Sequence, residues 1–143
     1  MALKLTAPVK KEFILEKTDA AWPSEGGATT ITIRQATQGD NELRNELFAR
    51  FQREYDNAGG VRVTQDISFD AIRRREVYLT LCGCNITNEN GDSLFKFGPN
   101  GRLTDEVAFR RAWSNLEPIT ADEIHEKVLE MNPMWRSDGG EAL

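Results

Sequence analysis

The sequence predicts an α+β fold that is mainly helical, with short N-terminal antiparallel β-strands followed by a bundle of about four helices. Near residue 31 apolar and polar residues alternate, which is the period of a strand with one buried face. From about residue 39 onward apolar residues recur every three or four positions, which is the period of an amphipathic helix. A chain of 143 residues is long enough to bury a substantial core.

We expect residues 1–135 to form a single globular domain and residues 136–143, which are small and polar, to form a flexible tail. The net charge of -5 argues against a nucleic-acid partner, because binding to phosphates needs a basic face. Every apolar run is shorter than the roughly 20 residues of a membrane span, and the N-terminus lacks the apolar core of a signal peptide. We therefore expect no membrane partner and a cytoplasmic location.

Two strands are predicted at residues 13–17 and 29–34. In the second, Ile31 and Ile33 alternate with threonines. A turn-rich loop containing Trp22 separates them, and an antiparallel pair is the simplest arrangement. Because an isolated pair is marginally stable in water, we expect it to pack on helices or to pair with another strand.

A helix is predicted from about Gly39 to Asn57. Its acidic first turn, with Asp40 and Glu42, suits the positive end of the helix dipole. The residues after Asn57 accept positive φ and so end the helix. Four apolar residues form one stripe along it: Leu43, Leu47, Phe51 and Tyr55.

The middle of the chain, residues 61–85, carries both strand-like and helix-like patterns. Residues 61–64 are compatible with a short third strand, and Ser68 with a helix cap. Residues 69–85 have helical character in their first half, whereas their second half alternates like a strand. The length of this segment and the absence of Gly or Pro before Gly83 favour one largely buried helix.

Two helices close the chain. Thr104 is predicted to cap the first, whose apolar face contains Phe109 and Trp113 and which ends before Pro118. Before this helix, residues 94–97 are predicted to form either a brief strand or an apolar segment tucked into the core.

The second closing helix is predicted to begin at Thr120. Thr120 and Glu123 have the spacing of a capping box, and Ile119 and Ile124 occupy the positions of a hydrophobic staple. The helix ends before Pro133.

No catalytic, cofactor-binding or metal-binding residue is predicted. Cys82 and Cys84 lack the second ligand pair of a structural zinc site, so we expect reduced, buried or half-buried structural thiols. His125 is the only histidine and is expected to face solvent from a helix, because no triad partner lies near it in sequence. The oxygen-bearing residues from Asn88 to Asp92 lack the bidentate glutamate of a calcium loop and indicate a plain turn.

Large aromatic residues are the candidate partner-binding residues: Trp22, Phe109, Trp113 and Trp135. Trp22 and Trp135 lie in loop-like or terminal segments, and exposed tryptophan is enriched at binding hot spots. The alternative is that both fold back over the core. For Phe109 and Trp113 a core position is the simpler interpretation.

Several segments resemble those of the tail assembly chaperones of long-tailed bacteriophages. They are the end of the second strand with the residues after it (31–39), the middle helical segment (69–81) and the closing helix pair (109–118 and 123–133). The resemblance covers most of the chain as pattern and size. It implies a small, mostly helical, non-enzymatic protein made during infection, often in a short and a frameshift-extended form.

The same resemblance implies the partners. Such a chaperone binds the tape-measure protein and recruits tail-tube subunits in the host cytoplasm, and it is absent from the finished virion. Self-association of the chaperone is left open. The main alternative is a virion structural protein, such as a head–tail connector or a tail-completion protein, which assembles into a ring through self-contacts. A third alternative is a small regulatory binding module of a cellular host.

Overall fold

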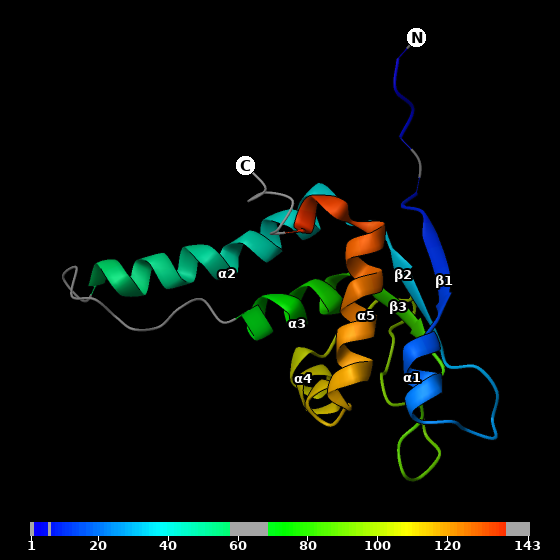
Figure 1. The fold of residues 1–143 in the computed structure, drawn as a ribbon. Helices are drawn as coiled ribbons and strands as arrows, with labels where there is room; N and C mark the ends of the chain where they lie inside the picture. Colours follow the sequence, from blue (N-terminus) through cyan, green and yellow to red (C-terminus); the bar gives the residue numbers. More distant parts are fainter. Residues whose placement is uncertain (1, 6, 58–68, 137–143) are drawn as a thin grey trace.

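A computed structural model describes residues 2–5, 7–57 and 69–136, and these form the α+β architecture predicted from the sequence (Figure 1). Its elements, in chain order, are β1 Lys10–Ile14, α1 Glu16–Ala21, β2 Thr30–Arg34, α2 Gln38–Asn57, α3 Phe69–Thr80, β3 Leu81–Cys84, α4 Glu106–Ser114, α5 Pro118–Met131 and the 3-10 helix η1 Pro133–Trp135. The tail at residues 137–143 lies outside the described residues, so its predicted flexibility stays a prediction.

The sheet has β2 at its centre, with β1 antiparallel on one side and β3 antiparallel on the other. The predicted N-terminal pair is thus confirmed. Its first strand covers residues 10–14 rather than 13–17, because residues 16–21 form the short helix α1. Six residues are too few for a helical period to show in the sequence.

The third strand comes from a segment that was predicted to remain helical. Helix α3 ends at Thr80, and the chain continues directly as β3 along the free edge of β2. A Cβ atom added at Gly83 would lie 3.0 Å from Oγ1 of Thr32, so the glycine lets the two strands approach closely. The predicted strand at 61–64 and the cap at Ser68 lie outside the described residues.

One hydrophobic core joins the sheet to the helices. Helix α5 packs across β2 and against α1 and α3, while α2 projects away from the body of the molecule (Figure 1). Segment 94–97 contributes a buried Phe95, which favours the tucked arrangement over a strand. The most buried apolar side chains are Leu15, Ile31, Ile33, Val77, Leu81, Phe95, Phe109, Ile124, Val128 and Trp135.

Helix α2 begins with a reciprocal cap that was not predicted. The Asp40 N–H donates to Oγ1 of Thr37 at 3.2 Å, and the Thr37 N–H donates to the Asp40 carboxylate at 2.9 Å. Leu47 is buried, but Leu43 is 42% exposed, so the predicted apolar stripe does not face inward along its whole length. The last two members of the stripe lie where side chains are not described.

Both closing helices begin at other residues than predicted. For α4 the cap is Asp105 rather than Thr104, and its carboxylate accepts the Ala108 N–H at 3.0 Å.

The capping box predicted at the start of α5 is wrong. This helix begins two residues earlier, at Pro118, with Glu117 as its N-cap. Proline suits this first position, because an N–H there would have no partner within the helix and proline has no N–H. Thr120 therefore lies inside the first turn, and Ile119 is exposed rather than part of a staple.

The Glu123 carboxylate instead caps a different helix. It accepts the Lys17 N–H at 2.9 Å, and the Thr18 N–H and hydroxyl at 2.8 Å each. These amides lie in the first turn of α1, whose N-cap residue Leu15 offers no side-chain acceptor. Glu123 thus connects α5 to α1 across the sequence.

We expect Glu123→Ala to destabilise the protein by about 1.5–3 kcal/mol, because it leaves buried donors of Thr18 without a charged acceptor. Glu123→Gln should cost less, since the amide oxygen still accepts. Thr120→Ala should also cost less. Urea unfolding of the three variants measures this order, and equal losses for Glu123→Ala and Thr120→Ala would contradict it.

Candidate functional site

The four aromatic candidates have different environments. Trp135 and Phe109 are 3% and 2% exposed, so Trp135 follows the alternative of folding back over the core and the core position of Phe109 is confirmed. Trp113 is half-buried and stacks on Phe109 with ring centroids 5.9 Å apart. Trp22 is 56% exposed at the end of α1. Of the four candidates, Trp22 therefore offers the most surface to a partner.

Trp135 is buried because the chain turns back after α5. Pro133 starts the 3-10 helix η1, which returns the indole to the core. The indole Nε1–H donates to Oδ1 of Asn41 at 3.1 Å, and the Arg44 guanidinium lies 5.4 Å from the ring centroid. Both polar partners come from α2, so Trp135 holds that helix against the body of the protein.

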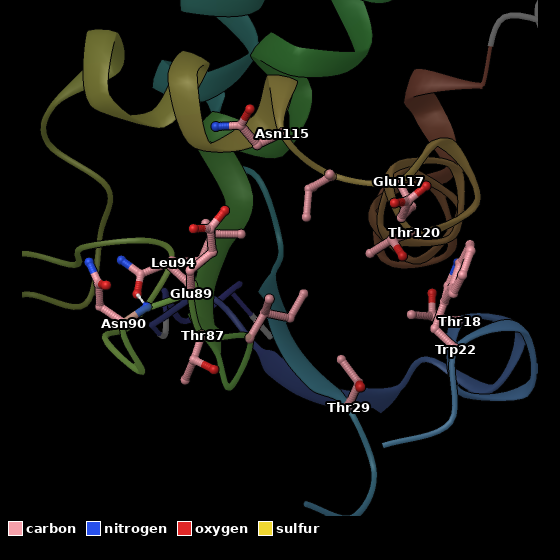
Figure 2. A pocket seen from close by; sticks show the side chains of 13 residues that line it. Thr18, Trp22, Thr29, Thr87, Glu89, Asn90, Leu94, Asn115, Glu117 and Thr120 are labelled. Carbon is pink, nitrogen blue, oxygen red and sulfur yellow. Dashed lines mark hydrogen bonds between the residues drawn. The ribbon is translucent and has the colours of Figure 1, made fainter. Parts of the chain in front are cut away.

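A hollow of about 650 Å³ lies beside Trp22 (Figure 2). Four parts of the chain line it: the end of α1 with Trp22, Thr29 just before β2, the loop from Ile86 to Leu94, and the turn from α4 into α5. We call it the Trp22 hollow. No pattern in the sequence indicated that these four parts meet.

The walls of the Trp22 hollow carry acidic and apolar groups. Figure 2 shows Glu89 on one wall and Glu117 on the opposite wall, on the same side as Trp22. Ile86, Leu94 and Leu116 also line the hollow and supply half-buried apolar surface. Neither glutamate was predicted to belong to a site, because nothing in the neighbouring sequence distinguishes them from the other glutamates of the chain.

The two cysteines lie on β3 and are half-buried, as expected for structural thiols. Burial raises the pKa of the Cys84 thiol to about 11, and it raises that of Cys82 as well. Because the thiolate is the reactive form, both residues are poor nucleophiles near neutral pH.

We expect Cys84 to react with a disulfide reagent near pH 8 about ten times more slowly than a free thiol of ordinary pKa 9.0, because the loss of thiolate outweighs the greater nucleophilicity of a more basic thiolate. The sign follows from the raised pKa, which lowers the thiolate fraction at any given pH. The rate should therefore continue to rise with pH where a free thiol has levelled off. The rate is measured on a Cys82→Ala variant, in which Cys84 is the remaining thiol. The same variant unfolded in guanidinium should react at the rate of a free thiol. Equal rates for the native and the unfolded protein would contradict the expectation.

His125 does not face solvent, in contrast to the prediction. Its side chain is 15% exposed, and Nε2 lies 2.6 Å from Oε1 of Glu76. Oε2 of Glu76 accepts from Nε of Arg44 at 2.6 Å, so one buried carboxylate joins α2, α3 and α5. A buried acid within a charged helix could not be recognised before the packing of α3 against α5 was known.

Within the described ranges, no three His, Cys, Asp or Glu side chains gather in a way that could hold a metal ion. Within the same ranges, no helix has the length and apolar character needed to cross a membrane.

Comparison of the chain with protein-family models, with curated proteins and with solved structures found no match.

Proposed function

We propose that this protein is a non-enzymatic tail assembly chaperone of a long-tailed bacteriophage. In this proposal it acts in the host cytoplasm during infection, binds the tape-measure protein, recruits tail-tube subunits and is left out of the mature virion. The resemblance of the second strand, the middle helix and the closing helices supports the family.

The observation that carries a binding function is the exposed Trp22 beside a hollow of about 650 Å³. Exposed tryptophan next to a concavity is typical of an anchor for a protein partner. The groups that enzymes most often use as nucleophile or base have structural partners here. Cys84 lies half-buried on β3, and His125 contacts the buried Glu76.

One observation favours the alternative of a virion component. The N-terminal segment runs away from the sheet (Figure 1), and Leu3 and Leu5 on it are each 89% exposed. Val9, just before β1, is 56% exposed. An exposed apolar arm of this kind suits contact with a neighbouring copy in a ring.

The two functions are separated by co-expressing the protein with the tape-measure protein of the same genome and by mass spectrometry of purified virions. The chaperone predicts a stable complex and its absence from particles. Trp22→Ala should weaken the complex about thirtyfold, as expected for a hot-spot aromatic residue. Met134→Ala, which removes another exposed apolar side chain (69% exposed), is the matched control and should bind normally.

Abundant protein in mature particles would overturn the chaperone and support the virion component, as would a closed ring in native mass spectrometry. A stable complex that is insensitive to Trp22→Ala would retain the chaperone and exclude Trp22 as its anchor.

A further inference from the structure

We propose that the Trp22 hollow receives an arginine side chain from an extended segment of the partner protein. This inference deepens the proposed function and rests on it, because it names the chemistry that the partner must present.

Charge is the first argument. Of the thirteen residues that line the hollow, the charged ones are Glu89 and Glu117, and both are acidic. Within the described part of the chain neither forms an ion pair, and Glu117 makes no side-chain bond to the helix that it caps. The start of α5 contributes only about half a positive charge at this end of the helix, so the hollow remains negative. It favours a cation.

A second layer of acid lies behind two lining threonines. Thr29 donates its N–H and hydroxyl to the Asp19 carboxylate, with the shortest bond at 2.7 Å. Thr18 does the same toward Glu123 at 2.8 Å. The half-buried Asp19 and the buried Glu123 are held in place by these hydrogen bonds, and their carboxylates add to the negative potential of the hollow.

The indole of Trp22 selects the kind of cation. An exposed tryptophan face attracts a cation, and arginine stacks on it more often than lysine. The planar guanidinium also carries five N–H donors in a fork that matches a carboxylate, so it can pair with an acidic side chain of the hollow while it stacks on the indole. The apolar surface of Ile86 and Leu116 suits the methylene stem of the same side chain.

The openness of the hollow favours a segment of polypeptide over a small molecule. Trp22, Glu89, Asn90, Asn115 and Glu117 are all exposed, so the site does not enclose its ligand as a small-molecule pocket does. The amides of Asn90 and Asn115 can both donate and accept, and thus can pair with the main chain of an extended peptide.

The test uses two synthetic peptides, acetyl-Ala-Arg-Leu-amide and its counterpart with neutral citrulline in place of arginine. Each is titrated into the full ¹⁵N-labelled protein, and the three indole N–H signals are followed by NMR. Trp22→Phe identifies the signal of Trp22. The arginine peptide should shift this signal saturably and leave those of Trp113 and Trp135 in place, whereas the citrulline peptide should bind about tenfold more weakly.

Glu89→Gln and Glu117→Gln keep size and shape and remove one charge each. Each should weaken the arginine peptide about threefold, and the double variant about tenfold. Glu130→Gln, at an exposed glutamate that does not line the hollow, is the matched control and should leave binding unchanged. The indole signals of the unbound variants show that the fold is retained.

Equal binding of both peptides, shifts confined to other residues, or no response of the Trp22 signal would each overturn the inference. Its failure is distinguishable from failure of the proposed function. If the tape-measure complex forms and is unaffected by the double Glu→Gln change, the chaperone stands and the arginine site is wrong. If no tape-measure complex forms, the proposed function itself has failed.

Discussion

Trp135→Ala is expected to destabilise the protein by about 3–5 kcal/mol, the range for truncating a buried aromatic side chain. The change opens a cavity in the core and leaves Oδ1 of Asn41 without its indole donor. It also removes the ring that the Arg44 guanidinium lies over. Urea unfolding followed by circular dichroism measures the loss.

Trp22→Ala is the matched control for this prediction. It truncates the same side chain at an exposed position, so stability should change by less than about 0.5 kcal/mol. Trp135→Phe should recover part of the lost stability, because it refills most of the cavity without restoring the hydrogen bond. A Trp135→Ala protein as stable as the wild type would show that η1 does not close the core.

Asp40→Ala is expected to cost about 3–5 kcal/mol, because it leaves the charge of Arg34 buried without its partner. Arg34 is 5% exposed and Asp40 is 2% exposed, with 2.6 Å between Nη1 and Oδ2. Asp40 also accepts from Arg102 at 2.6 Å and completes the cap of α2 with Thr37. The change therefore disturbs β2, α2 and the loop before α4 together.

Asp122→Ala provides the comparison. Asp122 also forms an ion pair, with Arg73, but its side chain is 67% exposed, so its loss should cost less than about 1 kcal/mol. Asp40→Asn should fall between the two, since the amide keeps a hydrogen-bond acceptor and loses the charge. Equal effects of Asp40→Ala and Asp122→Ala in urea unfolding would contradict the role assigned to Asp40.

The period of apolar residues determined the fold class and most helices. The alternation at Ile31 and Ile33 identified the central strand, and the spacing of Phe109 and Trp113 identified the face of α4 that turns to the core. These features are local, because the period of apolar residues within a strand or a helix already defines the face that it will bury.

Tertiary structure decided the features that depend on distant partners. The segment at residues 81–84 becomes a strand because β2 has a free edge beside it. Glu123 has the spacing of a local cap, yet it caps α1, whose amides lie more than a hundred positions away. Asp40, expected to complement a helix dipole, also neutralises the buried Arg34.

The candidate site divides in the same way. Trp22 and Trp135 are both tryptophans in irregular or terminal segments, and the sequence by itself determined only that either is a candidate anchor. The turn after Pro133 buries Trp135, while the end of α1 leaves Trp22 at the surface. Glu89 and Glu117 line the same hollow only because the loop before α4 and the turn after it come together there (Figure 2). Exposure and proximity are properties of the packed chain, so no local pattern contains them.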